Sequence, residues 1–163
     1  AAMNPCPCGW RGSALRECSC LEPEVARYRA KISGPLLDRI DLHVALAAVA
    51  WKDMLREGRS GESSEQVLAR VRAARGLQLE RYRSEPWSTN AELPTAALPR
   101  HCALRADARA LLERAVSALG LSMRAVVRCL RVARTIADLS GASAIDVGHI
   151  AEAISYRDAS RAP

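Results

Sequence analysis

Residues 122–139 read SMRAVVRCLRVARTIADL, and this stretch decides the fold because it predicts one long amphipathic helix. Ser122 is a favourable N-cap residue, and Gly141 follows closely enough to end the helix. The apolar residues recur at the spacing that gathers them along one side of a helix. They are Val126, Val127, Leu130, Ala133 and Ala137. A helix that buries one side needs other helices beside it, so the stretch predicts a small helical bundle.

Helical spacing and capping residues recur on both sides of this stretch. We expect helices from Ser63 or Ser64 to about Arg83, from Asp107 to Leu119 before Gly120, and from Ser143 or Asp146 to near Tyr156. Residues 86–99 read as an irregular linker, and two short helical segments are expected at 22–32 and 36–41. Residues 42–49 are apolar and partly alternating, which makes them the best strand candidate. The predicted fold is therefore mainly α: a helical bundle preceded by short helices and one or two strands.

The composition gives the chain a basic character without deciding its partner. Its 163 residues carry 24 Lys and Arg against 18 Asp and Glu, a formal net charge of +6. This balance would suit nucleic acid or a nucleotide, but an arginine- and alanine-rich sequence also follows from a GC-rich coding sequence. Every apolar run is interrupted before the roughly 18 residues that a membrane span needs. Residues 1–10 show no secretory signal, so we expect a cytoplasmic protein without membrane association.

Four of the six cysteines lie close together near the start of the sequence. Cys6 and Cys8 form one C-x-C hook, and Cys18 and Cys20 form a second hook after nine intervening residues. Four clustered thiols without a secretion signal favour a metal over a disulfide framework, and Zn²⁺ takes four thiolates in a tetrahedron. The hooks are one residue tighter than the usual C-x₂-C, so a cluster of reduced thiols stays open as an alternative. The other two cysteines are expected to pack as small apolar residues.

Two groups of arginines could contact an anion. Arg124, Arg128 and Arg131 fall at i, i+4 and i+7 of the predicted helix, so they share a face opposite its apolar side. This face is either a solvated basic surface or a phosphate site, since guanidinium groups offer paired donors to phosphate oxygens. Arg39 lies between two aspartates. It is either a locally paired surface arginine or one that is presented to a neighbouring subunit.

Three segments of the sequence together resemble a known family. They are NPCPCG at 4–9 with the second cysteine hook, YRAKISGPLLDRIDLHV at 28–44, and RVARTIADL at 131–139 preceded by Ser122 and Arg124. These segments resemble the magnesium-chelatase-like AAA+ ATPases, and within them the bacterial ComM branch, also called YifB, which is associated with competence. The resemblance extends over nearly the whole chain, although residues 56–100 match only in general helical character.

The resemblance implies roles for three residues. Asn4 matches the sensor-1 position, whose polar side chain orients the water that attacks the γ-phosphate. Arg39 matches the arginine finger, which reaches the nucleotide of the next subunit in a ring. Arg124 matches the sensor-2 arginine of a helical lid, which contacts bound nucleotide. By this resemblance the intact protein would be a homo-hexameric ring that uses ATP and Mg²⁺ to drive DNA branch migration. Positioned arginines suit phosphoryl transfer, which depends mainly on orientation and charge stabilisation.

The sequence departs from the family pattern in one respect. It contains no G-x-x-x-x-G-K-[ST] phosphate-binding loop and no apolar strand that ends in paired acidic residues. The resemblance places both upstream, so we expect the C-terminal part of an ATPase that is inactive alone. We expect a core remnant with the cysteine loop and the arginine finger at 1–55, a helix and linker at 56–100, and the lid at 101–163. A stand-alone, zinc-stabilised helical module that binds nucleic acid stays open as an alternative.

Overall fold

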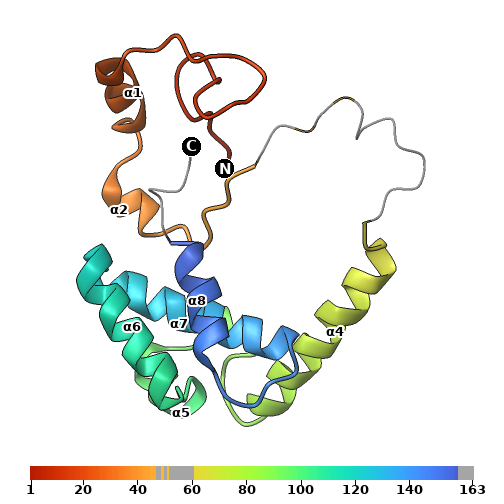
Figure 1. Ribbon diagram of the computed structural model, residues 1–163. Helices are drawn as coiled ribbons and strands as arrows, with labels where there is room; N and C mark the ends of the chain where they lie inside the picture. The colour runs from red at the N-terminus through yellow and green to blue at the C-terminus, as the bar shows by residue number, and fades with distance from the viewer. Residues whose placement is uncertain (47–48, 50, 52–60, 158–163) are drawn as a thin grey trace. The chain divides into compact units, whose positions relative to one another are not determined.

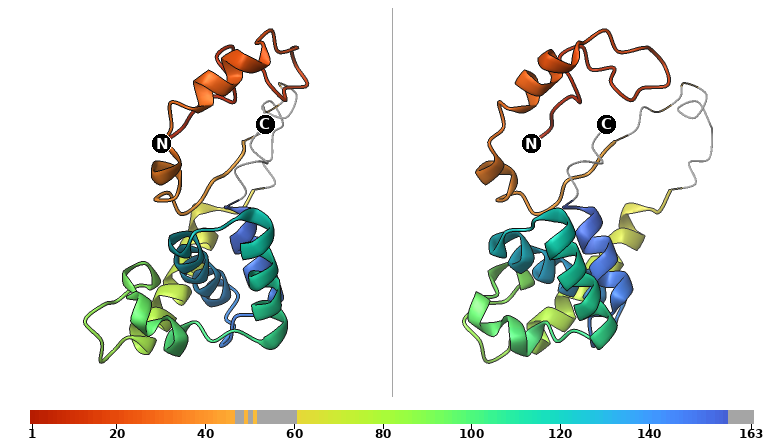
Figure 2. Two further views of the ribbon diagram at one scale, coloured as in Figure 1. Left: turned by 90° about the vertical axis from the view of Figure 1, so that its left-hand side faces the viewer. Right: turned by 60° about the vertical axis from the view of Figure 1, so that its left-hand side comes forward.

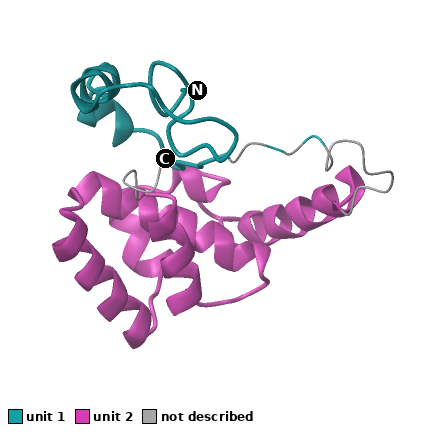
Figure 3. Cartoon of the chain, turned by 45° about the horizontal axis from the view of Figure 1, so that its top comes forward, with its two compact units in different colours: residues 1–59, 158–163 teal, residues 60–157 magenta. Residues whose placement is uncertain are grey.

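The computed structural model describes residues 1–46, 49, 51 and 61–157. The chain divides into two compact units, with the described residues of the first unit within 1–51 and those of the second within 61–157 (Figure 3). Among the helices of these described ranges, none combines the length and the apolar character that crossing a membrane requires.

The second unit is a bundle of helices (Figure 1). Its described elements are α4 (Ser64–Arg81), the 3₁₀ turns η1 (Asn90–Glu92) and η2 (Thr95–Ala97), α5 (Leu98–His101), α6 (Ala106–Leu119), α7 (Met123–Leu139) and α8 (Val147–Ser155). The four longer helices begin and end within a few residues of their predicted ends. The prediction of a mainly α fold is confirmed.

Capping side chains fix the ends of these helices. Ser63 Oγ accepts a hydrogen bond from Gln66 N at 3.2 Å, and the Gln66 side chain accepts one from Ser63 N at 2.8 Å, which forms a capping box at the start of α4. Ser122 Oγ accepts from Ala125 N at 3.2 Å at the start of α7. Gly120 ends α6 with a φ of 60°, a conformation that glycine adopts without a Cβ clash. The caps predicted at Ser63, Ser122 and Gly120 are confirmed.

The core of the second unit forms around α7, which contacts α4, α8 and η1, while α6 packs on α8 (Figure 2). Small side chains on α7 let the neighbouring backbones approach closely, and Cys129, Ala133 and Ala137 are fully buried. The larger side chains of Leu93 and Ile150 belong to the same buried cluster. Aliphatic, alanine and cysteine side chains thus supply most of the packing in a chain that contains no Phe.

A buried ionic network ties α4, η1 and α7 together. The Asp138 carboxylate accepts hydrogen bonds from Arg81 Nη1 at 2.9 Å and from Arg134 Nε at 3.1 Å. Asn90 Nδ2 donates to the same carboxylate at 2.8 Å. Arg134 is 1% exposed and also donates to two carbonyl oxygens of the loop after α7, at 2.5 and 2.9 Å. Burial of these charges is tolerated because each of them is paired and hydrogen-bonded.

The first unit contains two short helices, α1 (Glu22–Arg29) and α2 (Gly34–Leu37), which follow the cysteine-bearing loop. Pro23 lies in the first turn of α1, where its missing N–H costs nothing. Among the described residues of this unit, the buried hydrophobic side chains are Cys6 and Val25. This unit therefore has very little hydrophobic core.

The strand expected at 42–49 is wrong for the residues that the structure describes. Residues 42–46 and 49 are not in a strand, and residues 47–48 lie outside the described part. Alternating apolar residues alone do not make a strand, because the backbone N–H and C=O groups of a strand must pair with a neighbouring strand. The described elements of this chain include no such neighbour. The apolar side chains of the segment are exposed, with Leu46 at 87%.

Candidate functional site

The structure brings the two cysteine hooks together in the first unit. The Sγ atom of Cys6 lies 3.4 Å from that of Cys8 and 3.6 Å from that of Cys18, and the Cys8 and Cys18 sulfurs are 3.6 Å apart. With Cys20 included, the four sulfur atoms all lie within 4.8 Å of one another. A tetrahedral Zn²⁺ with Zn–S bonds of about 2.3 Å holds its sulfurs about 3.8 Å apart, so the arrangement is compatible with one Zn²⁺ ion.

Two glycine-dependent turns shape the loop that carries the hooks. Gly9 adopts a φ of +81°, and its N–H donates to the carbonyl oxygen of Cys6 at 3.0 Å. Gly12 has a φ of +76°, and beside it Ser13 N donates to Trp10 O at 3.0 Å. A side chain with a Cβ is strained in this left-handed region. The two turns therefore bend the chain between the first hook and the second.

Backbone N–H groups near the cluster act to lower the pKa values of its thiols. They belong to Arg11 near Cys6, Trp10 and Ser19 near Cys8, Cys20 near Cys18, and Cys8 near Cys20. An N–H that points at sulfur favours the thiolate over the thiol, because the positive end of the dipole faces the developing charge. In metal sites, such outer contacts also orient the ligands. The loop backbone thus favours the thiolate, although at Cys18 and Cys20 burial and the neighbouring thiols outweigh it and raise the pKa.

The four thiols differ in how readily they ionise. Hydrogen bonds from the backbones of Trp10 and Ser19 lower the pKa of Cys8 to about 6. The backbone N–H of Cys8 favours the Cys20 thiolate, but burial and the neighbouring sulfurs outweigh it and raise the pKa of Cys20 to about 12. The thiolate is therefore favoured at Cys8 and the thiol at Cys20.

Two contacts hold the cysteine loop on α1. The Arg11 guanidinium donates two hydrogen bonds to the Glu22 carboxylate, at 2.8 and 3.2 Å. Arg29 Nε donates to the carbonyl oxygen of Pro5 at 3.4 Å. Glu22 is the first residue of α1, where a negative charge also stabilises the helix. The loop and α1 are thus linked at both ends of the helix.

Asn4, which the family pattern matches to sensor 1, lies beside the first hook. A Cβ added at Gly9 would lie 3.7 Å from Asn4 Nδ2, so the Asn4 amide lies against the glycine of the turn. The Asn4 side chain is otherwise exposed. One of the residues predicted to be catalytic therefore neighbours the predicted metal ligands.

Arg39, which the family pattern matches to the arginine finger, follows α2 directly. Its side chain is exposed, and Nη1 donates to the carbonyl oxygen of Pro35 at 3.5 Å. Pro35 lies in the first turn of α2, where its fixed φ suits the start of a helix. The arginine is thus presented at the surface of the first unit.

The arginine row of α7 is not the uniformly outward face that the sequence predicts. Arg124 in the first turn is exposed, whereas Arg128 and Arg131 are half-buried. Arg131 Nη2 donates to the carbonyl oxygen of Leu93 at 2.5 Å. The 86–99 linker covers this part of α7, and such a tertiary contact cannot be read from spacing along one helix. The row therefore presents one exposed arginine, Arg124.

Sequence reasoning misses Arg134 and Asp138, the two charged residues that matter most for packing in the second unit. They lie four residues apart on α7, and the Arg134 and Asp138 side chains form a salt bridge at 2.9 Å. The available signal was an opposite-charge pair at i, i+4 directly beside the apolar side of the helix. The three histidines, including His43, a weak candidate for a further ligand on the sequence alone, lie outside the metal-compatible group that the described residues form.

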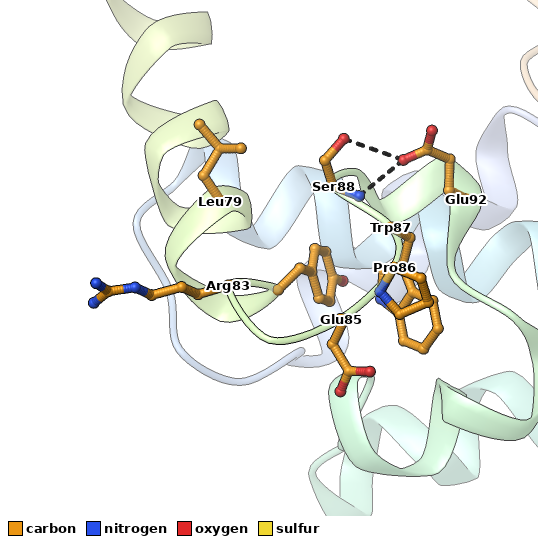
Figure 4. Close-up of a pocket in the computed structure, with 8 residues that line it drawn as sticks. Leu79, Arg83, Glu85, Pro86, Trp87, Ser88 and Glu92 are labelled. Atoms are coloured by element: carbon orange, nitrogen blue, oxygen red, sulfur yellow. Dashed lines mark hydrogen bonds between the residues drawn. The ribbon is translucent and has the colours of Figure 1, made fainter.

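Pockets lie on the second unit among the described residues, and two of them are well defined. One, of about 270 Å³, lies at the end of α4, where Ser88 N and Oγ donate to Glu92 at 3.0 and 3.3 Å (Figure 4). The other, of about 300 Å³, lies between α4, η1 and α7. The residues assigned to metal or nucleotide line neither pocket. The candidate site is therefore not one of these pockets.

Comparison with known proteins finds similarity along nearly the whole chain. The family model for magnesium chelatase, subunit ChlI, matches residues 1–54, and the model for the C-terminal part of subunit ChlI matches residues 61–157. Competence protein ComM of Haemophilus influenzae is 39% identical over 157 residues. The YifB proteins of Salmonella typhimurium and Escherichia coli are each 39% identical over 158 residues. Each alignment covers 96% of this chain, which spans 30% of the length of each of these relatives.

Proposed function

Because this chain belongs to the magnesium chelatase subunit ChlI family, we propose that it is the C-terminal part of a ring-forming AAA+ ATPase. In the intact protein the ring binds ATP with Mg²⁺, and hydrolysis drives DNA branch migration. Asn4 orients the attacking water, Arg39 reaches the nucleotide of the next subunit, and Arg124 contacts nucleotide from the lid.

The difference in exposure among the arginines carries this proposal. Arg39 and Arg124 are exposed. Arg131 and Arg134 instead direct donors to carbonyl oxygens of their own unit, and Arg134 also binds a carboxylate. Catalysis of phosphoryl transfer depends on positioned positive charge, and a guanidinium can pair with phosphate oxygens only if its donors are accessible. The two arginines matched to nucleotide contacts meet that condition.

Two observations support DNA as the substrate. The chain is similar to a protein named for competence. Its net charge of +6 also suits a polyanionic partner. These observations support DNA as the class of substrate.

The alternative of a stand-alone module that binds nucleic acid through α7 is less well supported. It needs Arg124, Arg128 and Arg131 on one open face, but Arg131 is half-buried and donates to Leu93 O. Family membership over residues 1–54 and 61–157 also favours an ATPase.

The test uses the intact protein that contains this chain. Arg39→Ala is expected to lower kcat for ATP hydrolysis by about 10³-fold or more, because an arginine finger stabilises charge in the transition state. The Kd for nucleotide is expected to stay close to the wild-type value. Arg124→Ala is expected to weaken nucleotide binding as well. Phosphate release and the binding of a fluorescent ADP measure the two effects, with Arg27→Ala, at an exposed arginine of α1, as the control.

Each part of the proposal can fail separately. A normal hydrolysis rate in the Arg39→Ala protein would show that Arg39 is not the finger. A labelled four-way DNA junction tests the substrate. If the wild-type protein hydrolyses ATP and leaves the junction unmoved, the ATPase proposal stands and the branch-migration proposal fails.

A further inference from the structure

The described residues of the first unit bury little apolar surface. Cys6 and Val25 are the buried hydrophobic residues among its described positions, while Leu15 and Leu21 are 66% and 69% exposed. The second unit, in contrast, has a continuous buried cluster around α7. Segments this small that cannot bury enough apolar surface usually depend on disulfides or a metal. All six cysteines are free, so no disulfide stabilises this unit, whereas four of them lie close enough together to share a metal.

We propose that residues 1–29 fold around one structural Zn²⁺ ion, held by Cys6, Cys8, Cys18 and Cys20, which takes the place of a hydrophobic core. The four sulfurs lie within 4.8 Å of one another, and Cys6 is fully buried. Four thiolates form a soft ligand set, which selects zinc over Mg²⁺ or Ca²⁺. All four positions are filled by protein atoms, as in structural rather than catalytic zinc sites.

The fold of the loop supports the same site. Gly9 turns the chain directly after the first hook with a φ of +81°, and its N–H donates to the carbonyl oxygen of Cys6 at 3.0 Å. This turn places Cys6, Cys8 and Cys18 within 3.6 Å of one another, although Cys18 lies ten residues after Cys8.

The ion would order more than its own ligands. Arg11, inside the loop, pairs with Glu22 at the start of α1, and Pro5 O accepts from Arg29 at the end of α1. Asn4 lies against Gly9 of the first hook. Removal of zinc is therefore expected to release the loop, α1 and the Asn4 side chain together. This inference stands whether or not the proposed ATPase function is correct.

Metal content is the first test. The full 163-residue chain, purified under reducing conditions, is expected to contain one zinc per chain by elemental analysis. The Cys6→Ser/Cys18→Ser variant is expected to lose it. The matched control is Cys102→Ala/Cys129→Ala, which changes the two cysteines buried in the second unit and is expected to keep one zinc.

Cobalt exchange and hydrogen exchange provide tests on the unmodified chain, which remain decisive if the double serine variant is insoluble. Co²⁺ in place of zinc is expected to show the strong thiolate-to-cobalt absorption of a tetrahedral sulfur site. A strong chelator is expected to raise amide exchange throughout residues 1–29 and to leave residues 61–157 unchanged.

Three results would overturn the inference. The first is soluble, reduced wild-type protein that contains no zinc and gives no thiolate-to-cobalt band. The second is iron in place of zinc. The third is bound zinc whose removal leaves the exchange of residues 1–29 unchanged, since the ion would then not hold the fold.

Discussion

Gly9 determines the geometry of the first cysteine hook, because its φ of +81° is strained for any residue with a Cβ. We predict that Gly9→Ala weakens zinc binding roughly 5–30-fold, which corresponds to a strain of about 1–2 kcal/mol. The added methyl would make only ordinary contact with Asn4, at 3.7 Å, so the effect comes from the backbone. Competition with a chromophoric chelator measures the affinity. Gly34→Ala is the control, because its Cβ would meet nothing within 4 Å, and equal affinities in the two variants would contradict the prediction.

Asp138 is the residue on which the ionic network of the second unit depends. Replacing it with Asn removes the charge that offsets Arg81 and the buried Arg134. We predict that Asp138→Asn destabilises the helical bundle by about 3–5 kcal/mol, the usual effect of leaving a buried charge without its partner. Urea unfolding followed by far-UV circular dichroism measures this. Glu113→Gln, at an exposed position of α6, is expected to change little, and a similarly small change for Asp138→Asn would show that the network contributes no net stability.

The Asp138 carboxylate also makes the stability of the helical bundle depend on pH. Burial alone would raise the pKa of the Asp138 carboxyl, but hydrogen bonds from Arg81 and Asn90 outweigh it and hold the pKa below its ordinary value. Because the pKa of this carboxyl is lower in the folded protein, its charge stabilises the fold fully at pH values above the pKa of an unfolded aspartate, about 3.9. The stabilisation is lost as the pH falls through the pKa of Asp138 in the folded protein. Wild-type protein is therefore expected to lose bundle stability on acidification below about pH 4. The Asp138→Asn protein should lose less over the same range in parallel urea titrations, and equal losses would assign the acid sensitivity to other groups.

At the level of single residues, the sequence predicts contacts between side chains that are close together along the chain. The cysteines of the two hooks could be grouped from their positions alone, and they do lie together. The partial burial of Arg131 could not be predicted, since the Arg131 side chain donates to the carbonyl oxygen of Leu93, 38 residues earlier in the chain. Nor could the burial of Arg134, which depends on a loop that folds back over α7. Side chains whose partners are distant in sequence are the ones that pattern analysis misassigns.

At the level of elements, helices could be predicted and the strand could not. The ends of α4, α6 and α7 are fixed by Ser63, Gly120 and Ser122, whose effects act within one turn of the chain. A strand at 42–49 would need backbone partners from another segment, and local alternation contains no information about whether they exist. The same distinction explains why the hydrogen bonds of the cysteine loop to α1 were not foreseen.

The first half of α4 is a helix with little tertiary support. The side chains of residues 64–73 are all exposed, whereas Ala74 and Gln78 further along are buried. Figures 1 and 3 show this half extending away from the other helices of its unit. Isolated helices of this length are marginal in water. We predict that amides 67–73 exchange with solvent much faster than those of α7, in a hydrogen-exchange experiment on the free chain.

The control for this experiment lies in the same helix. Amides 78–81 follow the buried side of α4 and are expected to exchange more slowly than 67–73. Uniformly slow exchange along α4 would contradict the prediction and would mean that a second molecule covers Val67 and Val71, which are 39% and 43% exposed here.

At the level of the whole molecule, the two units differ in what stabilises them. The second unit has a packed core and a paired ionic network, which are sufficient for a bundle of this size. The first unit has few buried side chains, and its surface ion pair between Arg11 and Glu22 contributes little in water. A structural metal supplies folding free energy directly in such segments. The proposed zinc ion and the proposed arginine finger thus belong to the unit with the weaker core, so that metal loss would affect catalysis through the fold.

Arg39 and Arg124 belong to different units. In the proposed ring they contact the nucleotides of different subunits, and an experiment that mixes variant subunits can distinguish the two roles. If Arg39 acts on the neighbouring subunit and Arg124 on its own, an Arg39→Ala subunit beside an Arg124→Ala subunit rebuilds one complete site. Intact proteins with the single changes are each expected to be nearly inactive. After random co-assembly in equal amounts, roughly a quarter of the interfaces should pair an intact Arg124 with an intact Arg39, and a comparable share of the ATPase rate should return. Mixing either variant with itself is the control. If co-assembled rings recover no activity, the proposed division of the two arginines between adjacent subunits is wrong.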